Sequence, residues 1–309
     1  MFFVTYVRFV WKHLPVFMIV LIGVSVLNTS LHQIDPPLMD SALLSAVPFI
    51  TALILLWFAV RKGPVKMKFL LWALMVTLFY CLPLLPQSRP PLDLELQQRI
   101  YEISALAQFA VIFIHASRWL DRRGLFWIFG LTFLFGCVLE NGGIIMGFFK
   151  EGDYLVYIPG IPAPLATMVG WTNVFYISFY ALDNILPKMN PIVRGFMCAL
   201  IGLSLDVAFD PVATKMGWWV WAESLDRRLF TVPLLNFVAW FWAIFPYAAV
   251  YYWIRGKETI GEEKKLRWFV GMIPVILIAE LAGVLGSLVA LGDSRGLEIF
   301  RLFFSAWLL

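Results

Sequence analysis

The sequence is poor in charged residues and has no long polar stretch. Charged residues make up 14% of the 309 positions and apolar residues 61%, whereas soluble domains are about a quarter charged and about half apolar. A soluble core cannot bury such an excess of apolar side chains, so we expect a membrane protein. The formal charge of +4 forms no basic block, which excludes nucleic acid as a partner.

Histidine, cysteine and phosphate-binding motifs are also scarce. The three histidines lie far apart, which excludes a di-iron desaturase or hydroxylase with its cluster of histidines: His13, His32 and His115. The cysteines each stand alone in an apolar run, with no CxxC pair: Cys81, Cys137 and Cys198. Neither of the phosphate-binding motifs GxxxxGK[ST] and GxGxxG follows a predicted strand. Nucleotide-driven transport and flavin- or nicotinamide-dependent chemistry therefore have no support in the sequence.

Long apolar runs without alternation predict helices that cross a bilayer. The run from Phe69 to Leu85 has about the length needed to span hydrocarbon. Charges, Gly and Pro delimit the predicted spans: 14–31, 42–60, 69–85, 100–116, 125–149, 164–186, 192–209, 230–254 and 268–291. With the N-terminus inside, Lys and Arg are roughly twice as frequent on inner loops as elsewhere. The first span is expected to be an uncleaved anchor, and the run 297–309 to lie in the interface.

The predicted fold is therefore all-α, a polytopic transmembrane bundle of about eight to ten helices forming one integral membrane domain over residues 1–309. Ionisable side chains inside such a bundle are candidates for function, because each costs a few kcal/mol to insert. Five stand out on the predicted spans: Glu102, His115, Glu140, Asp206 and Glu280. Asp210 lies four residues after Asp206, which puts both carboxylates on one helical face near the outer end of their span.

Each candidate also has a purely structural interpretation. Asp210-Pro211 is a common way to end a helix, and Glu102 and His115 lie near span ends, where water could solvate them. Glu280 could pair with a backbone group or an arginine. The aromatic residues of the outer loops could anchor the protein at the membrane surface: Tyr154, Tyr157, Trp218, Trp219 and Trp221. Glu140 is hardest to explain in this way, because it lies deep in its span and glycines that leave room for a ligand follow it.

Three segments resemble a known family: the stretch from Glu140 to Tyr157, PLATMVGW ending at Trp171, and DPVATKMGWWVW from Asp210 to Trp221. They are similar to the carotenoid-biosynthesis membrane family that includes the carotenoid 1,2-hydratases and bisanhydrobacterioruberin hydratase, over about residues 130–245. The matching positions are Glu140, Gly147, Gly152, Tyr154, Tyr157, Asp210, Pro211, Val212, Ala213, Gly217, Trp219 and Trp221. The first motif departs from the family in reading EGDYLVY, where Phe-Gly-x-Tyr-x-Tyr is usual, and NGG follows Glu140.

The resemblance implies a cofactor-independent hydratase, a lyase that adds water to the terminal C1=C2 bond of an acyclic carotenoid. Glu140, protonated in its apolar surroundings, is then the expected general acid, and Asp206 or Asp210, ionised nearer the wet surface, orients the water. Aromatic faces would stabilise the carbocation and wall a slot for the polyene: Tyr154, Tyr157, Trp171, Trp219 and Trp221. Neither a metal nor a cofactor is expected.

Two other functions remain open. The same acid and aromatic walls, kept free of water, would form a carotenoid end-group cyclase. The carboxylates could also serve as the proton relay of a lipid or small-solute transporter. The expected partners are membrane lipid and a long polyene or isoprenoid substrate, in what is expected to be a prokaryotic cytoplasmic membrane.

Overall fold

The computed structural model describes residues 94–215, 217–223, 225, 228–229, 232–293 and 297–298. The predicted spans at 14–31, 42–60 and 69–85 lie outside the described residues, as does most of the predicted interfacial run 297–309. Each later predicted span falls on a helix. The helices are α5 (Leu94–Ala116), α6 (Arg122–Leu125), η2 (Phe126–Gly130), α7 (Leu131–Ile145), α8 (Leu165–Ile185), α9 (Pro191–Lys215), α10 (Leu234–Arg255) and α11 (Glu262–Leu291).

The described part of the chain has four helices that are long and apolar enough to cross a membrane: Arg122–Ile145, Leu165–Asn184, Leu234–Arg255 and Glu262–Leu291. The first of these runs through α6, the π-helical turn η2 and α7. The predicted all-α membrane bundle is thereby confirmed. The total of eight to ten helices stays a prediction for the whole chain.

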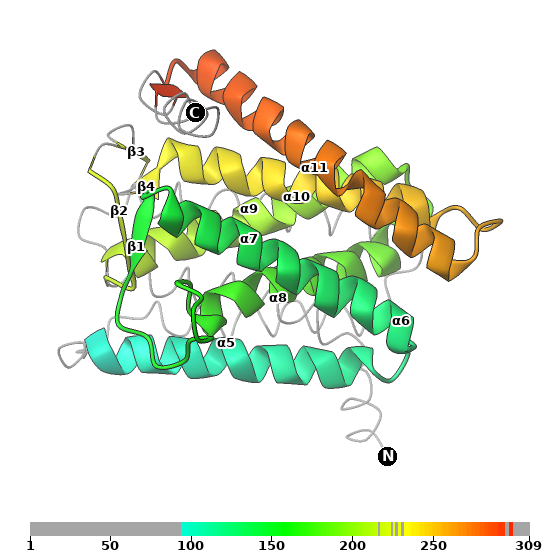
Figure 1. Ribbon diagram of the computed structural model, residues 1–309, viewed down its shortest axis with the longest axis horizontal. Helices are drawn as coiled ribbons and strands as arrows, with labels where there is room; N and C mark the ends of the chain where they lie inside the picture. Colours follow the sequence, from blue (N-terminus) through cyan, green and yellow to red (C-terminus); the bar gives the residue numbers. More distant parts are fainter. Residues whose placement is uncertain are drawn as a thin grey trace, which may run out of the picture.

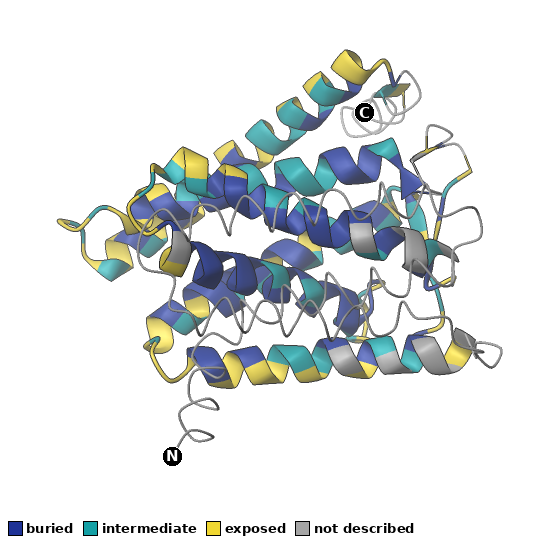
Figure 2. Ribbon diagram, turned by 180° about the vertical axis from the view of Figure 1, so that it is seen from behind, coloured by how far each residue is buried: buried dark blue, intermediate teal, exposed yellow. Residues whose placement is uncertain are grey.

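The helices pack side by side along the long axis of the molecule (Figure 1). α8 contacts α5, α7 and α9, while α10 lies between α9 and α11. Of the apolar window of α8, 83% is buried, against 17% for α11, so α8 is central and α11 turns most of its surface outward (Figure 2). The core of the bundle is rich in aromatic rings, such as Phe175 and Phe179 of α8 and Tyr247 of α10.

α9 does not end where the sequence predicts. The helix continues past Asp210-Pro211 to Lys215, so the interpretation of this dipeptide as a helix end is wrong. Proline removes one backbone donor and disfavours helix at the residue before it, but these are local costs. α9 makes its most extensive packing with α10, and this tertiary packing outweighs the local preference.

Two short strand pairs close one end of the bundle, at the left of Figure 1. β1 (Phe149–Glu151) pairs antiparallel with β2 (Trp219–Trp221), and β3 (Arg228–Leu229) with β4 (Val232–Pro233). The all-α prediction did not include them. Gly152 lets β1 approach the turn before β2, because a Cβ on this residue would lie 2.7 Å from the carbonyl oxygen of Gly217.

The register of β1 and β2 determines which side chains face inward. Glu151 lies opposite Trp219, Phe149 opposite Trp221, and Lys150 opposite Val220. Since side chains alternate along a strand, the first two pairs share one face. All four of those residues line a cavity, whereas Lys150 and Val220 are exposed.

Candidate active site

A cavity of about 320 Å³ lies between the ends of the helices and the β1–β2 pair. Its wall combines acidic side chains with aromatic ones. The carboxyl groups are those of Glu140, Glu151, Asp206 and Asp210. The aromatic lining is Tyr101, Phe149, Trp171, Phe209, Trp219, Trp221 and Trp240. Four carboxyl groups in one largely apolar cavity are costly to bury, which makes this cavity the candidate active site.

Glu140 faces the cavity from the last turns of α7. Its Oε1 accepts a 2.6 Å hydrogen bond from the indole Nε1–H of Trp171 on α8. The two helices come close one turn earlier, at Gly136, where a Cβ would lie 2.7 Å from the Cβ of Trp171. The Trp171 ring stacks on Trp240 of α10, with their centroids 4.1 Å apart. Glycine at position 136 thus permits the helix contact that brings this indole to the carboxyl group.

Asp206 and Asp210 share one amide group. The Nδ2 of Asn236 on α10 lies 3.1 and 2.9 Å from the two Asp206 oxygens and 3.0 Å from Oδ2 of Asp210. Both aspartates are buried, with 3% and 4% of their surface exposed. The expectation that they lie nearer the wet surface is therefore wrong, because α9 runs beyond Asp210 and α10 and β2 cover it.

Two indole groups approach Asp210 from β2. The N–H groups of Trp219 and Trp221 point toward this carboxyl group without reaching hydrogen-bond geometry. Both nitrogens are buried and have no hydrogen-bond partner among the described residues. Unpaired buried donors are rare, because each costs about 1–3 kcal/mol. A small polar molecule such as water, placed between these donors and Asp210, would satisfy them.

Glu151 is a cavity residue that the sequence analysis missed. Its side chain projects from β1, and both carboxyl oxygens are buried without a hydrogen-bond partner among the described residues. Burial, together with the nearby charges of Glu140 and Asp210, raises the pKa of Glu151 from 4.5 to about 9. Glu151 lies outside the apolar runs, in the stretch KEGD, whose composition is typical of a polar loop. The available signal was the alternation of Phe149, Lys150 and Glu151.

The structure does not bring the two predicted tyrosines to the cavity. Tyr154 is buried against Ala105 and Ala166, with its ring 6.3 Å from that of Tyr101. Tyr157 is exposed, and its hydroxyl donates a 3.4 Å hydrogen bond to the carbonyl of Gly152. Neither ring is part of the cavity wall.

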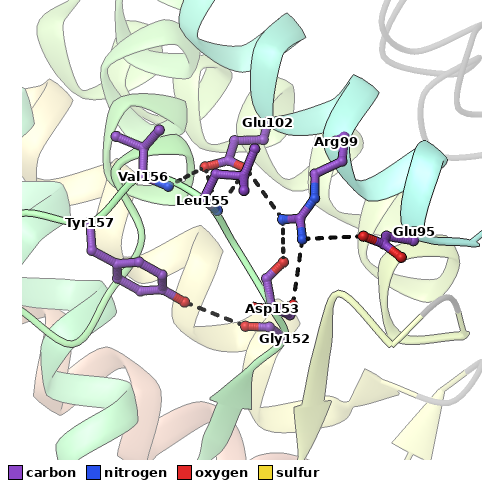
Figure 3. A network of polar contacts seen from close by, with 8 residues as sticks. All are labelled: Glu95, Arg99, Glu102, Gly152, Asp153, Leu155, Val156 and Tyr157. Atoms are coloured by element: carbon purple, nitrogen blue, oxygen red, sulfur yellow. Dashed lines mark hydrogen bonds and ion pairs between the residues drawn. The ribbon is translucent and has the colours of Figure 1, made fainter.

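Glu102 on α5 is buried and hydrogen-bonded to the loop after β1, so it is not a solvated side chain. It is 1% exposed and accepts hydrogen bonds of 2.7–3.1 Å from the backbone N–H groups of Leu155 and Val156, beside Arg99 at 3.9 Å (Figure 3). The expectation of a solvated span end is wrong here because α5 begins at Leu94, two turns before Glu102.

His115 and Glu280 lie away from the cavity. His115 is buried and its Nδ1 is 2.6 Å from the hydroxyl of Tyr176, so its expected solvation is also wrong. Glu280 is partly buried on α11, and its Oε2 has no hydrogen-bond partner among the described residues. Within the described ranges no three His, Cys, Asp or Glu side chains are arranged to hold a metal ion.

Fold and cavity together define a helical membrane protein with an acidic, aromatic-walled cavity. A family model described as carotenoid biosynthesis protein matches residues 100–292. This range is more than half of the chain and includes every residue that lines the cavity. The chain belongs to this family and has a role in carotenoid biosynthesis, so the family resemblance read from residues 130–245 is confirmed. No curated protein and no solved structure matches the chain significantly.

Proposed function

We propose that this protein hydrates the terminal C1=C2 double bond of an acyclic carotenoid and so produces a tertiary alcohol. One observation carries the proposal. Three carboxyl groups and three tryptophans, expected from the sequence to act together, line the same cavity. The carboxyl groups are those of Glu140, Asp206 and Asp210, and the indoles those of Trp171, Trp219 and Trp221.

The proposed reaction uses one proton donor and one acceptor. Glu140 transfers its proton to C2, and the electrons of the double bond form the new C–H bond, which leaves a tertiary cation at C1. Aromatic faces such as that of Trp171 stabilise the cation. Water attacks C1, and the aspartate pair formed by Asp206 and Asp210 takes the proton that the bound water loses. No cofactor takes part in this scheme.

The volume of the cavity suits a long substrate that inserts only one of its end groups. Its volume of about 320 Å³ is at the lower limit of pockets for drug-sized ligands, which is enough for the branched end group of a carotenoid but not for its whole length. The remainder of the polyene would lie in the lipid. We further propose that the protein crosses a prokaryotic cytoplasmic membrane several times, with lipid and a long polyene as its partners.

The polar groups around Asp210 in the cavity favour hydration over cyclisation. A cyclase needs an acid and aromatic walls, but its cation must be kept from water. In this cavity the indole N–H groups of Trp219 and Trp221 are unpaired beside Asp210, an arrangement suited to binding a water molecule. A transporter that uses the carboxylates as a proton relay would leave the polyene chemically unchanged.

The three functions can be separated by expressing the chain in a lycopene-producing bacterium and analysing the pigments by liquid chromatography with mass spectrometry. Hydration predicts products heavier by one or two water molecules with an unchanged chromophore. Cyclisation would give an isomer with a shortened chromophore, and either a transporter or a different substrate would leave lycopene intact. The Glu140→Gln variant is expected to make no hydrated product, and full conversion by that variant would contradict the assigned proton donor.

A further inference from the structure

Glu151 differs from the other carboxyl groups of the cavity in having no hydrogen bond. Glu140 accepts one from Trp171, and Asp206 and Asp210 share the amide of Asn236. Both oxygens of Glu151 are buried without a partner among the described residues, although the side chain lines the same cavity. Burying a carboxyl group without hydrogen-bond donors costs stability. The strand register places Glu151 opposite Trp219.

Glu151 interacts electrostatically with both the proposed proton donor and the proposed proton acceptor. The charges of both Glu140 and Asp210 add to the effect of burial in raising the pKa of Glu151. All three carboxyl groups line the same cavity, and charges interact more strongly in such largely apolar surroundings than in water. At neutral pH Glu151 holds a proton that no hydrogen bond fixes in place.

The proposed reaction leaves the cavity in a state that must be reset. After one hydration Glu140 has lost a proton to carbon, and the aspartate pair has gained one from water. The next hydration requires Glu140 to be protonated again. All three of these carboxyl groups line the same cavity, so a further ionisable group in that cavity is placed to carry a proton between them.

Resting on the proposed hydration, we propose that Glu151 is the proton relay that resets the site. Its carboxylic acid gives a proton to the Glu140 carboxylate and takes one from protonated Asp210. The transfer forms and breaks only O–H bonds, and the total number of protons in the cavity is unchanged. Glu151 is not needed for the first addition of water, because Glu140 is protonated at the start.

The experiment compares two regimes with purified protein in liposomes and lycopene as the probe. With protein in molar excess, each molecule needs to act once, and the rate at which Glu151→Gln forms hydrated product is the reference for that variant. With lycopene in excess the site must reset, and the rate of the same variant relative to its single-turnover rate should fall about 100-fold or more below the wild-type ratio, because a lost proton-transfer group typically costs about 10²–10⁴-fold. Glu151→Asp, which keeps an ionisable group, should recover part of that rate.

Asp153→Asn is the matched control. Asp153 lies two residues after Glu151 but is exposed and points to Arg99, so this variant should match wild type in both regimes. Thermal unfolding of each variant identifies any loss of fold. Equal rates for wild type and Glu151→Gln with lycopene in excess would overturn the relay, as would an equal loss in both regimes. Absence of product from the wild-type protein in both regimes would instead overturn the hydration itself, and the relay with it.

Discussion

The indole N–H of Trp171 donates a 2.6 Å hydrogen bond to the carboxyl group of Glu140, across the contact between α8 and α7. The face of the same indole stacks on Trp240 and lines the cavity. One side chain therefore orients the proposed proton donor and also contributes to the wall that would stabilise a carbocation. The orientation of the proposed proton donor and the aromatic wall of the cavity therefore both depend on Trp171.

Trp171→Phe separates these two contributions, because phenylalanine keeps an aromatic face and loses the donor. We expect the hydration rate to fall about tenfold, equivalent to about 1.4 kcal/mol, and the free energy of unfolding to fall by about 1 kcal/mol. Turnover and thermal unfolding of the purified protein measure both effects. Trp253→Phe, at the far end of α10 and partly exposed, should change neither. Unaltered turnover in Trp171→Phe would remove the hydrogen bond from the mechanism.

The amide of Asn236 donates hydrogen bonds to both Asp206 and Asp210, so its removal should destabilise both buried carboxyl groups. Asn236→Ala leaves two buried carboxyl groups without their shared donor, so we expect the unfolding free energy to fall by about 1–3 kcal/mol. In the background of Asp206→Asn, which brings a new amide next to Asp210, the loss should be smaller. Denaturation of the two single variants and the double variant measures this coupling. Strictly additive effects would show that the three side chains do not act as a unit.

Glu102 stabilises the loop after β1 by accepting hydrogen bonds from the backbone N–H groups of Leu155 and Val156. Glu102→Ala leaves these donors unpaired, and we expect a loss of about 2 kcal/mol or more in unfolding free energy. Amide hydrogen exchange at Leu155 and Val156 should accelerate. Glu95→Ala removes an exposed carboxyl group that lies 3.7 Å from Arg99 and should cost less than about 0.5 kcal/mol. Similar losses in the two variants would contradict the role given to Glu102.

Glu151 should make the stability of the protein depend on pH. Burial, with the charges of Glu140 and Asp210, raises the pKa of Glu151 from 4.5 to about 9 in the folded protein. Between these values the folded state binds more protons at this site than the unfolded state, so the contribution of Glu151 to stability falls as pH rises. Glu151→Gln should therefore melt at a higher temperature than wild type near pH 8 and by a smaller margin near pH 5. A constant difference across this range would contradict the raised pKa.

The sequence was sufficient to predict the helices of the described region and part of the cavity. Apolar runs and their flanking charges predicted each span from 100–116 onward, because a helix that crosses a membrane needs a long apolar run. The same rule made Glu140 and Asp206 conspicuous as ionisable residues inside such runs. Spacing of i,i+4 then added Asp210, and the structure holds it beside Asp206 through Asn236.

What the sequence did not reveal depends on contacts between distant segments. Glu151 enters the cavity because β1 pairs with β2, some 70 residues later in the chain, and three-residue strands carry too little pattern to predict. The continuation of α9 past Pro211 depends on its packing against α10. Likewise, nothing local to Tyr154 or Tyr157 indicates that neither ring reaches the cavity.

The central claim is the addition of water to a polyene end group, and isotopic labelling tests it most directly. Purified protein in liposomes would be given lycopene in water enriched in heavy oxygen, and the products analysed by mass spectrometry. The proposed function predicts a tertiary alcohol at C1 that carries the heavy isotope, formed by the wild-type protein and not by Glu140→Gln. Unlabelled products, or lycopene recovered unchanged or as a cyclised isomer, would contradict it.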